Sequence, residues 1–164
     1  MSNIIGEALP RPDALGKVTG ETNYPADLVR AGMLHLKVVF AGRAHGRIAA
    51  IDTGAAQAHP GVVAVLTAAD VPFNAFGLID HDQPVLCGDK VRFQGDKVAL
   101  VVAESKRAAN AAARLVQVRY DDLPAVTDAR AAMQPGAPLV HDERGTNVLF
   151  SMPIRKGDVA QGFA

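Results

Sequence analysis

The fold depends most on residues 97–120, KVALVVAESKRAANAAARLVQVRY. Six consecutive apolar residues after Lys97 predict a strand buried on both faces, which belongs at the centre of a sheet. Ser105 is a favourable N-cap for a helix, and the alternation in VQVRY predicts a second strand with Val116, Val118 and Tyr120 pointing inward. We therefore expect a strand–helix–strand unit, with a right-handed crossover if its two strands are parallel.

The helix of this unit is predicted to be amphipathic. The side expected to face the sheet carries Ala108, Ala112, Leu115 and Val116. The opposite side carries Lys106, Arg107, Asn110 and Arg114. Short alanine side chains would let the helix lie close on the strands.

Three further segments upstream have strand character. Residues 34–40 alternate strictly, and the face expected to be buried carries Leu34, Leu36, Val38 and Phe40. A glycine-containing connection leads to RIAAIDT (47–53), so we expect these two strands to form an antiparallel hairpin. Thr53 is expected to cap a short helical turn that ends before Pro60, and GVVAVLT (61–67) is a third strand.

The remaining segments are irregular in pattern. Prolines and glycines predict an extended lead-in over residues 1–32, and scattered turn residues predict a long loop over residues 68–90. Residues 133–164 lack periodicity until Asp158, which is typical of a helix start. Only six residues follow Asp158, so we expect the chain to continue into a longer polypeptide.

Composition limits the class of protein. A chain of 164 residues with 49% hydrophobic content fits one domain of the α/β or α+β class, built on a mixed β-sheet. Its formal net charge of zero favours neither nucleic acid nor an anionic membrane as a partner. The single cysteine, Cys87, excludes an intramolecular disulfide. We expect a cytoplasmic location because no signal peptide or apolar run of membrane-spanning length occurs.

Few residues suggest chemistry. Neither glycine-rich phosphate motif occurs, and we interpret Arg43, His45 and Arg47 as solvated residues of a hairpin turn rather than a catalytic or anion-binding group. Asp80, His81 and Asp82 could hold a divalent cation, but neighbours in an extended loop point to opposite sides, so a solvated loop is favoured. We interpret Cys87 as a small buried hydrophobe and assign no role to His35, His59 and His141.

Several blocks read together are more specific than any single motif. They are GKVTGETNYPADL (16–28), GMLHLKVVFAGRAHGRIAAIDTGAAQAHPGVVAVLTAADVP (32–72), VRFQGDKVALVVAESKRAANAAARLVQVRYDDLPAV (91–126) and GDVAQGF (157–163). In this order the chain resembles the N-terminal a/b hammerhead domain of the molybdenum-cofactor (large) subunit of the xanthine dehydrogenase and aldehyde oxidase family.

The resemblance implies a domain of an oxidoreductase rather than a complete enzyme. It implies an a/b hammerhead domain over residues 16–132, after a lead-in over 1–15 and before an extended linker over 133–164 that leads toward a cofactor-binding domain. Enzymes of this family oxidise aldehydes, purines and related N-heterocycles with a molybdopterin cofactor, and iron–sulfur clusters and FAD lie on partner domains or subunits. No catalytic, cofactor-binding or metal residue is carried over to this chain.

Three functional hypotheses follow. The first is a structural or assembly domain, or small subunit, of a molybdenum hydroxylase, with the loop Ala68–Lys90 as its contact surface. The alternative is a free-standing binding or scaffolding module that keeps the fold without the enzyme. The third, ranked lowest, is a small metal-dependent hydrolase that uses Asp80, His81 and Asp82.

Overall fold

The structure is a computed structural model that describes residues 5–78 and 80–164. Residues 1–4 of the predicted lead-in and residue 79 of the predicted loop lie outside the described residues. The chain divides into two compact units, Met1–Met33 and Leu34–Ala164, and each is described by itself.

The first unit contains two short helices, so the wholly extended lead-in predicted there is wrong. They are α1 (Ala14–Thr19) and the 3-10 helix η1 (Pro25–Asp27). Helix α1 begins shortly after Pro12 and ends at Thr19. It is followed by Gly20, whose φ of 79° is the left-handed conformation that favours glycine after a helix. Gly20 therefore follows one helix, Pro25 begins the other and Gly16 lies within α1, so these residues do not prevent helix formation.

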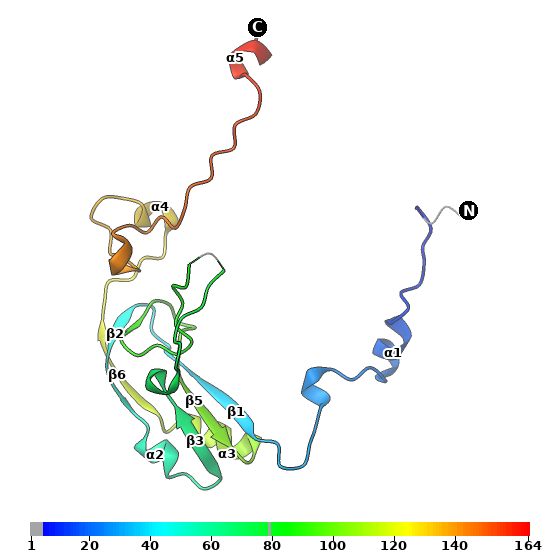
Figure 1. Cartoon of the computed structure of the whole chain (residues 1–164), viewed down its shortest axis with the longest axis vertical. Helices are drawn as coiled ribbons and strands as arrows, with labels where there is room; N and C mark the ends of the chain where they lie inside the picture. Colours follow the sequence, from blue (N-terminus) through cyan, green and yellow to red (C-terminus); the bar gives the residue numbers. More distant parts are fainter. Residues whose placement is uncertain (1–4, 79) are drawn as a thin grey trace. The chain divides into compact units, whose positions relative to one another are not determined.

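The second unit is built on two antiparallel sheets, each with three strands (Figure 1). The first has the order β1-β5-β3, with β1 His35–Phe40, β5 Lys97–Ala103 and β3 Val62–Leu66. The second has the order β4-β2-β6, with β4 Lys90–Val91, β2 Gly46–Asp52 and β6 Gln117–Asp122. The α+β class is confirmed, although the ladders are all antiparallel among the described residues rather than mixed.

Strand β5 is the central strand of the first sheet, as predicted from its continuous apolar run. It pairs with β1 on one side and β3 on the other. Val98 and Val101 are both fully buried. A strand with apolar residues on both faces is stable only where both faces are covered, and β5 contributes residues to three core clusters of this unit.

The predicted hairpin between residues 34–40 and 47–53 is wrong, because β1 and β2 lie in different sheets. After β1, the backbone N–H of Ala41 donates to the carbonyl of Asp96 at 2.7 Å and Gly42 N donates to Gln94 O at 3.2 Å. The chain thus stays beside β5 until it crosses to the second sheet, where β2 pairs with β6. The alternation of apolar and polar residues indicates that a segment is a strand, but it does not identify the strand with which it pairs.

The strand–helix–strand unit forms, but its strands do not share a sheet. Ser105 Oγ accepts a hydrogen bond from Ala108 N at 3.1 Å and caps α3 (Lys106–Ala113), as predicted. Helix α3 buries Ala108, Ala109 and Ala112, whereas Leu115 beyond its end is 39% exposed. Because β6 joins β2 in the second sheet, the conditional right-handed crossover does not arise.

The face of β1 that packs inward is the opposite of the predicted one. Val39 packs against two of the core clusters, whereas Leu36 is 62% and Phe40 57% exposed. Helix α3 contacts β1 and covers the side of Val39, so that side becomes the core. The alternation predicts the strand correctly but not its inner face.

Short helices complete the second unit. Helix α2 (Gly54–Gln57) forms where a turn was predicted, but Asp52 Oδ1 rather than the Thr53 side chain accepts from the backbone N–H of Gly54. The 3-10 helices η2 (Ala68–Asp70) and η3 (Asp142–Arg144) and helix α4 (Ala129–Ala132) lie in the connecting segments. Helix α5 (Val159–Gly162) follows Asp158, which caps it as predicted. Among the described residues, no helix has the length and apolar character needed to cross a membrane.

Candidate functional site

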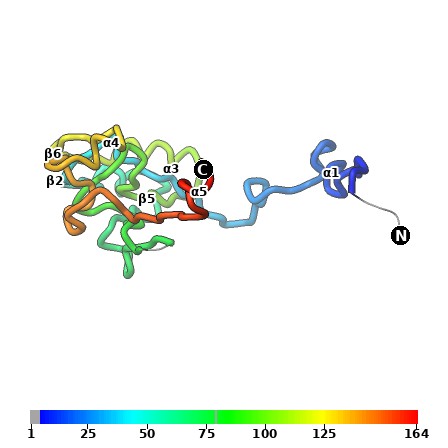
Figure 2. Tube along the Cα trace, turned by 90° about the horizontal axis from the view of Figure 1, so that it is seen from above, coloured from blue at the N-terminus to red at the C-terminus, as the bar shows by residue number. Residues whose placement is uncertain are grey.

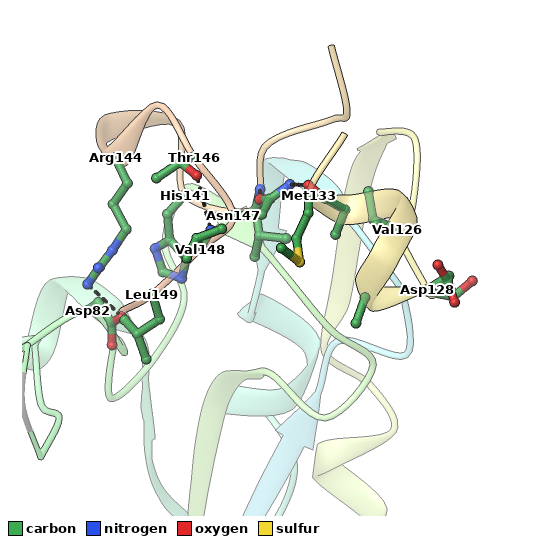
Figure 3. A pocket seen from close by; sticks show the side chains of 14 residues that line it. Asp82, Val126, Asp128, Met133, His141, Arg144, Thr146, Asn147, Val148 and Leu149 are labelled. Atoms are coloured by element: carbon green, nitrogen blue, oxygen red, sulfur yellow. Dashed lines mark hydrogen bonds and ion pairs between the residues drawn. The ribbon is translucent and has the colours of Figure 1, made fainter. Parts of the chain in front are cut away.

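A cavity of about 490 Å³ opens among residues that follow β6 (Figure 3). Its lining comes mostly from helix α4, η3 and the segments that flank them: Asp82, Val126, Thr127, Asp128, Ala129, Ala132, Met133, Val140, His141, Arg144, Thr146, Asn147, Val148 and Leu149. Apolar side chains form most of this wall, and Asp82 with Arg144 forms a charged edge. No sequence signal predicts this cavity, because its lining lies in segments without periodicity.

Arg144 joins the cavity edge to the long loop. Its Nη2 donates to Asp80 Oδ2 at 2.8 Å and to Asp82 Oδ2 at 3.0 Å. The hydrogen bond from Arg144 to Asp80 is the main reason that the pKa of the guanidinium is raised above its ordinary value. One guanidinium therefore binds both carboxylates, and Asp80 and Asp82 lie on the same side of the loop, as residues two apart in an extended segment do.

The same contacts weaken the case for a metal site at residues 80–82. His81 packs its ring edge-on against Phe73, with 5.9 Å between the ring centroids. Within residues 5–78 and 80–164, no group of three or more His, Cys, Asp or Glu side chains could hold a metal ion. Asp80 and Asp82 have structural partners, so their chemistry in this structure is that of an ion pair.

A buried lysine anchors the segment 139–142 to the second sheet. Lys90, in β4, is only 2% exposed. Its Nζ donates to the carbonyl of Leu139 and to Asp142 Oδ2, both at 3.2 Å. The hydrogen bond from Lys90 lowers the pKa of the Asp142 carboxyl, and the nearby Arg47 guanidinium, 3.6 Å away, adds to this effect. A buried ammonium is tolerated only with such partners.

The Asn147 side chain joins three positions of the segment 132–147 by hydrogen bonds. Its Oδ1 accepts from the backbone N–H of Val140 at 2.9 Å. Its Nδ2 donates to the carbonyls of Ala132 at 3.0 Å and Pro138 at 2.9 Å. We call residues 138–147 the latch, because Lys90, Arg92 and Arg144 tie this segment to the sheets and the loop. Figure 2 shows it in orange, close to the labels of β2 and β6.

His45 is buried, which contradicts its interpretation as a solvated turn residue. It is 7% exposed, and its Nδ1 donates to the carbonyl of Pro124 at 2.7 Å. Its Nε2 is buried without a hydrogen-bond partner among the described residues. The loop carries His45 inward because it crosses from one sheet to the other. Gly46 lies close to β6, and a Cβ at this position would be 3.2 Å from Asp121 O, which is a tight contact.

The two arginines beside His45 lie at the surface, as predicted. The Arg43 guanidinium lies over the Tyr120 ring, 5.8 Å from its centroid, and its Nε is 3.9 Å from Asp122 Oδ1. Arg47 is more than half exposed beside Asp142. Both arginines therefore form ordinary surface ion pairs.

The other candidates of the sequence have structural surroundings. Cys87 is 1% exposed, and burial raises the pKa of its thiol to about 12. It is a neutral core residue at physiological pH, as predicted, and not a nucleophile. His59 Nδ1 bonds to the carbonyl of Pro60, and His141 Nδ1 bonds to Glu143 Oε1 at 3.0 Å. His35 lies half-buried in the edge strand β1.

Similarity to known proteins indicates a family for this chain, which the geometry of the cavity does not. The family model for the a/b hammerhead domain of aldehyde oxidase and xanthine dehydrogenase matches residues 19–124. An aldehyde oxidoreductase of Megalodesulfovibrio gigas is 43% identical over 169 residues, which cover 94% of this chain and 18% of the relative. The xanthine dehydrogenase molybdenum-binding subunit of Escherichia coli O157:H7 is 36% identical over 163 residues, with 92% and 21% covered.

A solved structure shares the fold. Quinoline 2-oxidoreductase from Pseudomonas putida 86 matches with a TM-score of 0.79 and 38% identity, covering 92% of this chain and 20% of that one. The present chain therefore spans about a fifth of the length of the curated relatives it matches.

Proposed function

The chain belongs to the aldehyde oxidase and xanthine dehydrogenase family, and from this we propose that it is a structural and assembly domain of a molybdenum hydroxylase that is not catalytic alone. The family resemblance read from the sequence blocks is confirmed. In this proposal the complete enzyme oxidises aldehydes, purines or related N-heterocycles in the cytoplasm. Partner domains or subunits hold molybdopterin, iron–sulfur clusters and FAD.

The described residues do not fit a molybdenum site. They offer no metal-binding group, the Asp80 and Asp82 carboxylates bind Arg144, and the Cys87 thiol is buried and neutral. We therefore derive no catalytic step through the cofactor. In this proposal the residues of this chain form a core, anchor the latch and present surfaces that partner domains or subunits contact.

The observation that carries the proposal is the exposed apolar surface of the loop Ala68–Lys90. Phe73 is 68%, Phe76 43% and Leu78 100% exposed. Apolar side chains gathered on a protruding loop are typical of a surface that binds a neighbouring protein. The ion pairs of Arg144 with Asp80 and Asp82 hold this loop against the latch, so the loop is positioned before contact.

Purification of the molybdenum enzyme from the organism that makes this chain tests the proposal. We expect peptides of residues 5–164 in every active fraction, in a constant ratio to molybdenum. An active enzyme whose polypeptides lack this sequence would contradict the proposal and favour the free-standing module instead.

A loop variant tests the contact surface separately. Leu78→Ser should leave folding of the chain unchanged, because the side chain is fully exposed, and should lower the yield of assembled enzyme. Val29→Ser is the control, since Val29 is 82% exposed and lies outside both the loop and the linker. Equal yields from the two variants would exclude the loop as a contact.

A further inference from the structure

A second cleft, of about 380 Å³, lies between the long loop and the latch and shares part of its lining with the larger cavity described above. Phe76 and Phe93 contribute aromatic rings to its wall, and Arg92 and Lys97 contribute cationic groups. We call it the aromatic cleft. Clefts of this size, with a largely apolar wall and a few polar groups, are typical of small-molecule sites.

The two aromatic rings are held in place by backbone contacts. Phe76 and Gln83 form an antiparallel bridge, in which the backbone N–H of each donates to the carbonyl of the other, at 2.8 and 3.0 Å. Phe93 N donates to Asp96 Oδ2 at 3.2 Å, and Asp96 N donates to Phe93 O at 3.1 Å. The Phe93 ring occupies the space beside Gly95, where an added Cβ would lie 2.5 Å from a ring carbon. The aromatic wall is therefore formed before any ligand enters.

Both rings keep a large part of their surface open. Phe93 is 60% and Phe76 43% exposed. The Lys97 ammonium lies over the Phe76 ring, 5.1 Å from its centroid, and this cation–π contact places a positive charge beside the aromatic wall. Exposed aromatic rings bind other planar rings by stacking or edge-to-face contact, in addition to burying apolar area. The wall therefore suits a planar aromatic ligand.

The two cations of the cleft have unused hydrogen-bond donors. Arg92 Nε donates to the carbonyl of Val140 at 3.2 Å, but the two terminal nitrogens of its guanidinium have no partner within residues 5–78 and 80–164. In the same part of the chain, Lys97 Nζ forms neither a hydrogen bond nor an ion pair. A carboxylate that entered the cleft would accept charge-assisted hydrogen bonds from these groups.

The acidic side chains of the cleft are already engaged. Asp82 Oδ2 accepts from Arg144, as Figure 3 shows, and Asp96 Oδ2 accepts from two backbone N–H groups. The larger cavity differs in this respect, because its guanidinium, that of Arg144, is bound by both Asp80 and Asp82. An anionic ligand is therefore favoured in the aromatic cleft and not in the larger cavity.

We propose that the aromatic cleft binds a small planar aromatic molecule that carries one anionic group, such as an aromatic carboxylate. Its ring lies against Phe76 and Phe93, and its carboxylate accepts hydrogen bonds from Arg92 and Lys97. Binding of this ligand does not require the proposed assembly role, because every contact named lies within this chain.

Titration calorimetry with three matched compounds tests the chemistry of the site. The purified 164-residue chain is titrated with 2-naphthoate, with the neutral 2-naphthylmethanol and with the non-planar anion decahydro-2-naphthoate. We expect saturable binding of one 2-naphthoate per chain, and at least tenfold weaker binding of the other two compounds. No saturable binding of 2-naphthoate at millimolar concentration, or equal affinity for all three compounds, would overturn the proposal.

Matched variants test the position of the site. Phe93→Leu removes a ring and Lys97→Met removes a charge, so each should weaken the binding of 2-naphthoate at least fivefold. Phe73→Leu and Lys37→Met are the controls, because both side chains are exposed and neither lines the cleft. Circular dichroism establishes that each variant is folded. Equal affinities in the cleft variants and their controls would place the ligand elsewhere and overturn the proposal.

Nuclear magnetic resonance of the native chain gives a measurement that needs no variant. We expect 2-naphthoate to shift the backbone amide signals of Phe76, Arg92 and Phe93. Shifts confined to Met133 and Leu149, which line only the larger cavity, would assign the ligand to that cavity and contradict the proposal.

Discussion

At the scale of single residues, burial changes the meaning of the polar side chains that stand out in the sequence. His45 and Lys90 are both inside the fold, and each bonds a backbone carbonyl far away in the sequence. Neither contact leaves a local pattern, because the partners are Pro124 and Leu139 in irregular segments. Burial of Cys87 is predicted correctly because VLCGDK places it beside apolar residues before a strand.

Cys87 provides a prediction about pH. Its pKa is about 12 in the folded chain and about 9 as an ordinary thiol, so the folded state binds this proton more tightly than the unfolded state. The contribution of this raised pKa to the free energy of unfolding is fully present below pH 9 and is lost as the pH rises toward 12. Urea unfolding at about pH 8 and about pH 11 should show a larger loss in the native chain than in Cys87→Ala. An equal loss in both would contradict this prediction.

The Lys90–Asp142 pair provides a second prediction. Asp142→Asn should lower the free energy of unfolding more than Lys90→Met, because the first leaves a buried ammonium without its anion and the second removes the charge. The lowered pKa of Asp142 means that its stabilising effect is present above the ordinary value of 3.8 and is lost as the pH falls below it. Thermal unfolding of both variants at about pH 7 and about pH 3 checks the order, which a lower stability of Lys90→Met at neutral pH would contradict.

At the scale of secondary structure, the sequence predicts elements better than their partners. The continuous apolar run of β5, the Ser105 cap and the alanine side of α3 are local signals, and all three are confirmed. The pairing of β2 with β6 joins residues far apart in the sequence, and no period encodes it. The cavity and the latch could not be predicted either, because they depend on contacts of single side chains such as Asn147. Such contacts leave no periodic pattern in the sequence.

The cap of α3 has a measurable stability. Ser105→Ala removes the acceptor for Ala108 N, so it should destabilise the fold by about 1 kcal/mol. Ser105→Asp, which keeps an acceptor, should lose much less. Chemical denaturation of the two variants measures the difference, and equal losses would show that the hydroxyl does not cap the helix.

The latch provides a prediction at the same scale. Asn147→Ala removes three hydrogen bonds that join residues 132–140 to residue 147, so local opening of this segment should become more frequent. Limited proteolysis should then cut the variant within residues 138–147 several times faster than the native chain. Asn23→Ala, in the first unit, is the control and should leave the cleavage rate at the latch unchanged.

At the scale of the whole molecule, we expect the exposed apolar surfaces to contribute more to function than the cavity does. The loop Ala68–Lys90 presents apolar side chains, whereas the described residues bring together no metal-binding group. A net charge of zero gives no field that would attract a charged partner from a distance. We therefore expect apolar contact to dominate the assembly of this domain with the rest of the enzyme.

The most direct test of a supporting, non-catalytic role is an assay of aldehyde and purine oxidation by the purified 164-residue chain beside the complete molybdenum enzyme. The account predicts turnover by the complete enzyme and a rate for the isolated chain no greater than that of buffer. Turnover by the isolated chain, free of molybdenum and pterin, would contradict it.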